Sequence, residues 1–164
     1  MYPVQSATAV DLLSELEALW GGERDFFIRA ANAAALLFWR LPEVNWVGFY
    51  LRDGEELVLG PFQGKPACQR IPLNRGVCGR AARQRRTLCI PDVRHEPDYI
   101  ACSPETRSEL VVPLLSTDCL YGVLDVDSPR QARFTSQDIA LLESVAQKLL
   151  SGADLERLRR YYQL

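Results

Sequence analysis

GPFQGKPACQRIPLNRGVCG (residues 60–79) and GVLDVDS (residues 122–128) are the two stretches around which the 164-residue chain is organised. Together with YIAC (residues 99–102) they bring three cysteines and two carboxylates into the middle of the sequence, and a further carboxylate lies between them. These residues are Cys68, Cys78, Cys102, Glu109, Asp125 and Asp127. Thiols can be oxidised in pairs and carboxylates can hold a cation, so the combination indicates a redox enzyme for a small zwitterion.

Short strands joined by tight turns surround these motifs. NWVGFYL (residues 45–51) is rich in strand-forming residues, and the following Asp53-Gly54 is a strong hairpin signal. A helix over 76–85 and an irregular loop over 91–106 interrupt the run of strands. The further strands are expected at residues 56–59, 65–71, 87–90, 108–115 and 120–127. Tight turns between strands predict an antiparallel sheet of about six strands.

Helices are expected before and after the sheet. An apolar stripe predicts a helix over residues 6–20 capped by Ser6, and an alanine-rich helix follows over 25–39. Thr135 can cap a last helix, which either ends at Gly152 or continues beyond it. We therefore expect one α+β domain over 1–164, with helices over 6–40, the sheet and site over 44–128, and a C-terminal helix over 135–151 or beyond. The terminal helices should pack on one face of the sheet.

Composition and charge exclude several classes of protein. The net charge is −2 and the one short basic run is RQRR (residues 83–86), so nucleic acid is not an expected partner. No apolar run reaches the length of a membrane span, and the N-terminus lacks a basic signal region, so we expect a cytoplasmic protein with reduced thiols. The five cysteines form no C-x-x-C pair and the single histidine is His95, so no metal or other cofactor is expected.

Each candidate residue also has a structural interpretation. A single cysteine is more often a small buried hydrophobe than a reactive thiol, and Cys89 and Cys119 are interpreted in that way. Cys78 falls in the first turn of a predicted helix, where the dipole lowers a thiol pKa, and Cys102 falls on a loop that gives it access. These placements favour a function without requiring one.

The carboxylates and aromatic residues share faces of the predicted strands. Asp125 and Asp127 are two residues apart, so both point to one face, as either a solvated strand end or a cation site. Without histidines an ammonium fits such a site better than a metal, and Glu109 can face the same cavity. Trp46 and Tyr50 also share a face, either as sheet core or as the wall of a pocket for a methyl group.

GPFQGKPAC, IPLNRGVCG, IAC and GVLDVDS together resemble the motifs of the free methionine-R-sulfoxide reductases, a family of GAF-domain enzymes. The motifs stand in that family's order, with ten residues from Cys68 to Cys78 and twenty-four from Cys78 to Cys102. The resemblance runs from about Trp46 to the final helix and excludes the tail after Gly152. It implies a GAF-like fold, often as a homodimer. It also implies reduction of free L-methionine-R-sulfoxide, with thioredoxin as reductant and no cofactor.

The same resemblance implies a role for each candidate residue. Cys102 corresponds to the nucleophile and Cys68 to the first resolving cysteine, while Cys78 is a third redox cysteine, either a resolver or the central thiol. The positions that match the substrate-binding and pocket-lining residues of the family are Glu109, Asp125, Asp127, Trp46 and Tyr50. The alternatives are a non-catalytic GAF module that binds a ligand and a thiol redox sensor. A sensor would need the cysteines but not the three carboxylates.

Overall fold

The computed structural model describes residues 9–164, so the expected N-cap Ser6 lies outside the described residues. The helices are α1 (Ala9–Trp20), α2 (Phe26–Arg40), α3 (Gly76–Gln84), α4 (Ser136–Gly152) and α5 (Leu155–Tyr161), with the short 3₁₀ helix η1 (Val93–His95). The strands are β1 (Trp46–Asp53), β2 (Glu56–Gly64), β3 (Arg70–Pro72), β4 (Leu88–Ile90), β5 (Ser108–Ser116) and β6 (Cys119–Ser128). Within the described part of the chain, no helix is long and apolar enough to cross a membrane.

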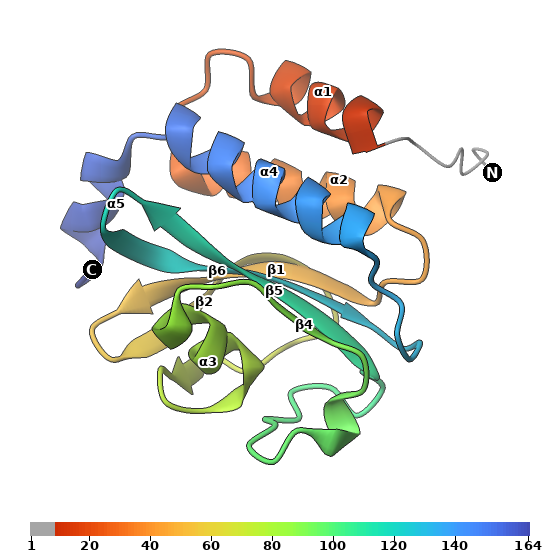
Figure 1. Cartoon of the computed structure of the whole chain (residues 1–164). Helices are drawn as coiled ribbons and strands as arrows, with labels where there is room; N and C mark the ends of the chain where they lie inside the picture. The colour runs from red at the N-terminus through yellow and green to blue at the C-terminus, as the bar shows by residue number, and fades with distance from the viewer. Residues whose placement is uncertain (1–8) are drawn as a thin grey trace.

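The six strands form one antiparallel sheet in the order β3-β2-β1-β6-β5-β4 (Figure 1). The two strands that carry the carboxylates, β5 and β6, are neighbours, and β6 also pairs with β1. The centre of the sheet therefore joins a strand from early in the chain to the hairpin that carries the carboxylates. The expected antiparallel sheet of about six strands is confirmed.

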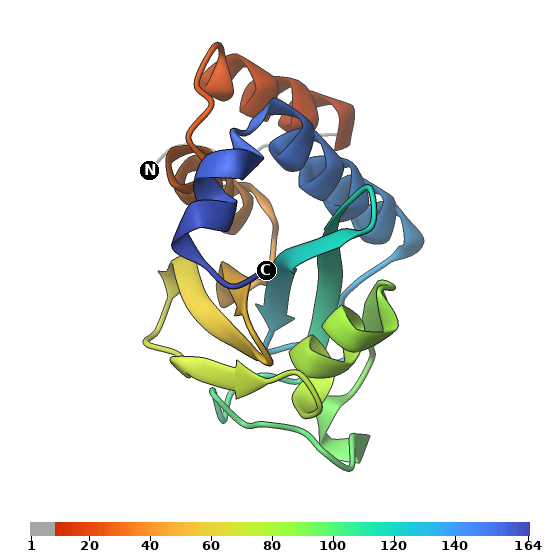
Figure 2. The same ribbon diagram turned by 90° about the vertical axis from the view of Figure 1, so that its left-hand side faces the viewer.

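The helices divide between the two faces of this sheet (Figures 1 and 2). α2 packs on β1 and β2, α4 packs on β5, and α1 packs on α2 and α4, so all three cover one face. α3 contacts β5 and β6 on the opposite face, where the loop between β4 and β5 also lies. The expectation that the N- and C-terminal helices share a face is confirmed, and the other face is left for α3 and loops.

Alternation along the strands produces two apolar clusters. From β1, Val47, Phe49 and Leu51 enter the core beneath α1, α2 and α4. Trp46 and Tyr50, which alternate with them, enter the second cluster on the side of α3. Successive side chains in a strand point to opposite faces, so this division fixes which side chains of β1 can reach the α3 side.

The strands around the first motif differ from the prediction: β2 continues to Gly64, beyond the predicted end at residue 59, and the chain re-enters the sheet only at Arg70. Residues 65–71 were expected to form a strand, but only Arg70–Pro72 pairs, as β3. Pro66 has no N–H to donate to a strand ladder. Two aromatic side chains instead bind the carbonyl groups of this segment: Trp46 Nε1 donates to Lys65 O over 3.1 Å, and the Tyr50 hydroxyl donates to Cys68 O over 3.0 Å.

The C-terminal segment resolves the alternative left open by the sequence. α4 begins with a reciprocal capping box between Thr135 and Asp138 and ends at Gly152. A separate helix, α5, then starts after Asp154, whose side chain accepts a hydrogen bond from Arg157 N. The irregular loop over 91–106 is also not wholly irregular, because η1 forms within it after Asp92.

Gly122 provides a test of the contact between β1 and β6. Its φ is +152°, and a Cβ at this position would lie 2.0 Å from Tyr50 O on the neighbouring strand. We expect Gly122→Ala to lower the free energy of unfolding by about 2 kcal/mol or more, because the backbones must separate. Urea denaturation measures this change. Gly22→Ala is the control, since a Cβ there meets nothing within 4 Å, and equal losses in both variants would contradict the argument.

Candidate active site

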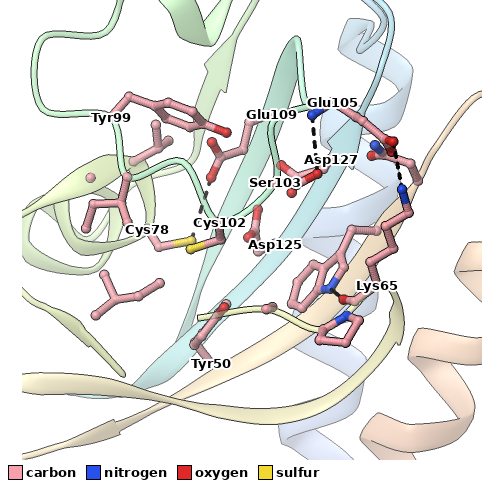
Figure 3. A pocket seen from close by; sticks show the side chains of 18 residues that line it. Tyr50, Lys65, Cys78, Tyr99, Cys102, Ser103, Glu105, Glu109, Asp125 and Asp127 are labelled. Atoms are coloured by element: carbon pink, nitrogen blue, oxygen red, sulfur yellow. Dashed lines mark hydrogen bonds and ion pairs between the residues drawn. The ribbon is translucent and has the colours of Figure 1, made fainter. Parts of the chain in front are cut away.

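The candidate site is a cavity of about 90 Å³ between the sheet, the start of α3, and the loops that follow β2 and precede β5 (Figure 3). Pockets for drug-sized ligands start at roughly 300 Å³, so this cavity suits a much smaller molecule. All eight residues to which the sequence assigned a role either line the cavity or are bonded to a residue that does. Those in the lining are Trp46, Tyr50, Cys78, Cys102, Glu109, Asp125 and Asp127.

Strand register brings the three carboxylates together. Glu109 on β5 lies directly opposite Asp127 on β6, and Asp125 lies two residues before Asp127 on the same face. Glu109 and Asp125 are only 5% and 6% exposed. Burial is the largest cause that raises the pKa of both Glu109 and Asp127 well above the ordinary value, and the neighbouring negative charges add to it. Burial also raises the pKa of Asp125 to about 6.

The cavity lacks a cation among its buried groups. Of the described residues in its lining, Lys65 alone is basic, and it lies at the exposed mouth with Nζ 2.7 Å from Glu105 Oε1 (Figure 3). Asp125 Oδ1 is buried and has no hydrogen-bond partner. A buried oxygen of this kind is costly unless something donates to it or neutralises it. The interior is therefore suited to a small positively charged group.

Two of the three candidate redox cysteines are joined. Cys68 and Cys102 form a disulfide between residues 34 apart in the sequence, with 5.4 Å between their Cα atoms. Both are half-buried and lie on the loops that close the cavity. The loop of Cys68 is fixed from below by the hydrogen bonds of Trp46 and Tyr50. The cysteines that the resemblance pairs as nucleophile and resolver are thus within bonding distance in this fold.

Cys78 has the opposite environment from the one that its helix position predicts. It lies in the first turn of α3, but it is buried and its Sγ donates to Glu109 Oε1 over 3.7 Å. Burial first, and then the negative charge of Asp125, raises the pKa of this thiol well above its ordinary value. Any lowering by the helix dipole is overcome, because burial removes the thiolate from water and the nearby carboxylates repel its charge.

Trp46 and Tyr50 belong both to the core of the sheet and to the wall of the pocket, which were the two alternatives left open by the sequence. The Trp46 indole stacks between Tyr50, at 5.8 Å between centroids, and Phe62, at 5.4 Å. It crosses the sheet above Gly48, where a Cβ would lie 2.3 Å from the indole. Trp46 and Tyr50 are therefore part of the apolar cluster on the α3 side and also form a wall of the cavity.

Several positions in and around the cavity were not identified correctly from sequence. Lys65 belongs to the motif GPFQGKPAC but was interpreted as the start of a strand, while Glu105 and Tyr99 lie in an irregular loop with no periodic signal. The cavity lining does not include the three residues that the sequence left without a function, Cys89, Cys119 and His95. The first two pack against the helix-side core, in agreement with their structural interpretation, and His95 is exposed as expected.

Asp125→Asn tests the cost of burying this carboxyl group. Its pKa rises from 3.8 to about 6 on folding, so above pH 4 the unfolded chain loses this proton before the folded chain does. The free energy of unfolding therefore falls as the pH rises through this window. We expect the variant to match the wild type near pH 4 and to exceed it by up to about 3 kcal/mol at pH 7 in urea denaturation.

The control for this titration is Asp118→Asn, which changes an exposed carboxyl group at the turn between β5 and β6. Its stability should stay within about 0.5 kcal/mol of the wild type at both pH values. A constant difference between Asp125→Asn and the wild type across the pH range would show that the carboxyl group is not desolvated by folding.

Comparison with known proteins agrees with this architecture. The model of the GAF domain matches residues 28–149. A free methionine-R-sulfoxide reductase of Escherichia coli is 45% identical over 150 residues, which covers 90% of this chain and 91% of that protein. A protein of the same name from Saccharomyces cerevisiae is 41% identical over 143 residues, or 82% of this chain and 79% of the relative.

A solved structure extends the similarity to three dimensions. The X-ray structure of free methionine-R-sulfoxide reductase from Neisseria meningitidis in complex with its substrate has a TM-score of 0.87 and 42% identity, and the match covers 93% of this chain and 94% of that one. The expected GAF fold is thereby confirmed. With the identities and coverage above, these similarities establish that the chain belongs to the free methionine-R-sulfoxide reductase family of GAF-domain proteins.

Proposed function

We propose that this protein reduces free L-methionine-R-sulfoxide to L-methionine, with Cys102 as nucleophile. The observation that carries the proposal is the meeting of a disulfide-bonded cysteine pair and three carboxyl groups, two of them buried, at one small cavity. A redox sensor has no use for the carboxylates, and a non-catalytic module has no use for the cysteine pair. The relatives named free methionine-R-sulfoxide reductase support the same reaction.

Charge accounts for the preference for a free amino acid. The α-ammonium of methionine sulfoxide supplies the positive charge that the cavity lacks, and Asp125 with its unpartnered oxygen is the group best placed to receive it. A peptide nitrogen carries no charge, so a methionine sulfoxide within a protein would leave the buried carboxylate unpaired. Trp46 and Tyr50 offer an apolar surface to the S-methyl group, and this contact would favour one sulfoxide epimer.

The α-carboxylate needs a partner of opposite charge, and Lys65 is the candidate. Its ammonium group is at the mouth of the cavity and is paired with Glu105, both exposed, so exchange of one carboxylate for another costs little there. A substrate that places its ammonium inward and its carboxylate outward would pair with Asp125 and Lys65 together.

The proposed reaction begins with attack on the sulfoxide. The Cys102 thiolate attacks the sulfoxide sulfur, and the oxygen receives a proton from Glu109 or Asp127, whose pKa values are raised by burial. The S–O bond of the sulfoxide breaks with its electron pair left on the methionine sulfur, the hydroxyl group passes to the sulfur of Cys102, and methionine leaves while Cys102 becomes a sulfenic acid. The Cys68 thiol then condenses with the sulfenic acid, which releases water and forms the Cys68–Cys102 disulfide. In total, two thiols and the sulfoxide become a disulfide, methionine and water.

Recovery of the thiols completes the proposed cycle. Both sulfurs belong to half-buried residues on surface loops, which gives a dithiol protein access to one of them. Thioredoxin is the proposed reductant, by thiol–disulfide exchange. Cys78 does not take part in the bond and, with its raised pKa, is a poor thiolate at neutral pH, which favours Cys102 over Cys78 as the nucleophile.

A coupled assay with thioredoxin, thioredoxin reductase and NADPH tests the proposal. We expect NADPH consumption with free methionine-R-sulfoxide, and none above background with the S epimer or with a peptide-bound sulfoxide. Cys102→Ser should abolish turnover and retain the fold by circular dichroism, whereas Cys89→Ser, on a cysteine outside the cavity, should retain full activity. Full activity of Cys102→Ser would move the nucleophile to Cys78, and no turnover by the reduced wild type would refute the proposal.

Lys65→Met tests recognition of the substrate carboxylate. We expect KM to rise by about tenfold, with kcat changed far less, because Lys65 binds the substrate away from the reacting sulfur. Glu105→Gln is the matched control, since it removes the same ion pair but leaves the ammonium group free. If Lys65 acts only as a tie between the two loops, both variants will show the same rise in KM.

A further inference from the structure

Three buried donor atoms converge in the floor of the cavity. Cys78 Sγ, a carboxylate oxygen of Glu109 and a carboxylate oxygen of Asp125 all lie within 4.8 Å of one another. They come from α3, β5 and β6, so the rigid elements of the fold position them rather than the loops (Figure 3). The three residues are between 4% and 6% exposed, which separates this cluster from the solvated acidic groups common on protein surfaces.

A second observation is that one oxygen atom of this cluster lacks a partner. Asp125 Oδ1 is buried without any hydrogen bond, and Asp125 lines the cavity next to the other two donors. The thiol of Cys78 satisfies Glu109, but one thiol proton cannot serve both carboxyl groups with equal geometry. A cation between the three atoms would satisfy the oxygen that the protein itself leaves unpaired.

We propose that Cys78, Glu109 and Asp125 bind a divalent metal ion of borderline softness, represented by Zn²⁺. A thiolate with two carboxylate oxygens is a donor set for zinc, and a water molecule from the cavity can complete four-coordination. Mg²⁺ and Ca²⁺ prefer oxygen ligands alone and are excluded by the sulfur. Binding displaces the proton of the thiol, and of either carboxyl group that carries one.

The single histidine in the sequence was the reason to expect no metal site. The fold instead brings together three possible ligands that are not histidines. Cys78 is separated from Glu109 by 31 residues and from Asp125 by more, so these ligands do not form a recognisable metal-binding motif in the sequence. The metal would occupy the position proposed above for the substrate ammonium, and this part of the inference rests on the proposed function. Zn²⁺ would therefore act as an inhibitor that competes with substrate, not as a cofactor.

The disulfide makes a decisive experiment possible. In the oxidised protein Cys68 and Cys102 are bonded to each other, so the thiols that remain are Cys78, Cys89 and Cys119. We would titrate oxidised protein with Co²⁺, a spectroscopic probe for zinc sites, and follow the charge-transfer absorption of a thiolate–cobalt bond. One equivalent of Co²⁺ should produce the band, and Zn²⁺ should remove it by displacement.

Variants assign the band to its ligands. Cys78→Ser should abolish it, and Asp125→Asn should weaken binding of Co²⁺ by about tenfold or more while the fold is retained by circular dichroism. Cys89→Ser and Cys119→Ser are matched controls, since both cysteines pack against the helix-side core, and each should keep the wild-type band.

Two results would overturn the proposal. A band that survives in Cys78→Ser would place the metal elsewhere, and a band that appears only after reduction would assign it to the Cys68 and Cys102 thiols. Because Asp125→Asn alters one atom of a side chain and keeps its shape, it tests the site even if Cys78→Ser fails to fold. The titration involves neither substrate nor turnover, so its outcome is independent of the proposed reductase activity.

Discussion

The register of the three central strands is the constraint on which the rest of the structure depends. β6 pairs with β1 so that Asp127 lies opposite Trp46, and with β5 so that it lies opposite Glu109. The residues that alternate with these, such as Val126, enter the core beneath the helices. A slip of one residue would turn carboxylates into that core and apolar side chains into the cavity, at a prohibitive cost in burial free energy. The fold and the site are thus fixed by the same hydrogen-bond ladder.

The cavity contains buried carboxyl groups without a positively charged partner, and the rest of the protein must offset the free-energy cost of burying them. Glu109 and Asp125 are buried with raised pKa values, and Asp125 keeps an unpaired oxygen. The large apolar core on the opposite face supplies the stability that allows this arrangement to persist. A proton, an ammonium group or a divalent metal ion would each reduce this cost. For this reason the proposed acid chemistry, the proposed preference for a free amino acid and the inferred metal site all arise from one feature.

The loops over the cavity are joined by two contacts of different chemistry. The Cys68–Cys102 disulfide and the Lys65–Glu105 ion pair both connect the segment after β2 to the segment before β5. Reduction of the disulfide leaves an exposed ion pair, which is a weak tie, between the same two segments. The base of the first loop is held separately, because Trp46 and Tyr50 donate hydrogen bonds to its carbonyl groups. One covalent bond and one exposed ion pair therefore hold the two segments together over the cavity.

The sequence alone determined what depends on neighbours along the chain. It predicted the strands, the start of α4 at Thr135, the shared face of Asp125 and Asp127, and, through the motifs, the cysteines and acids that line the cavity. Tertiary structure decided what depends on residues far apart. It reversed the pKa shift expected for Cys78, drew residues 65–69 out of the sheet, and placed Lys65 at the mouth. The physical reason is range: helix and strand periodicity arises from local backbone geometry, whereas burial and the charges that surround a group are set by the packing of distant segments.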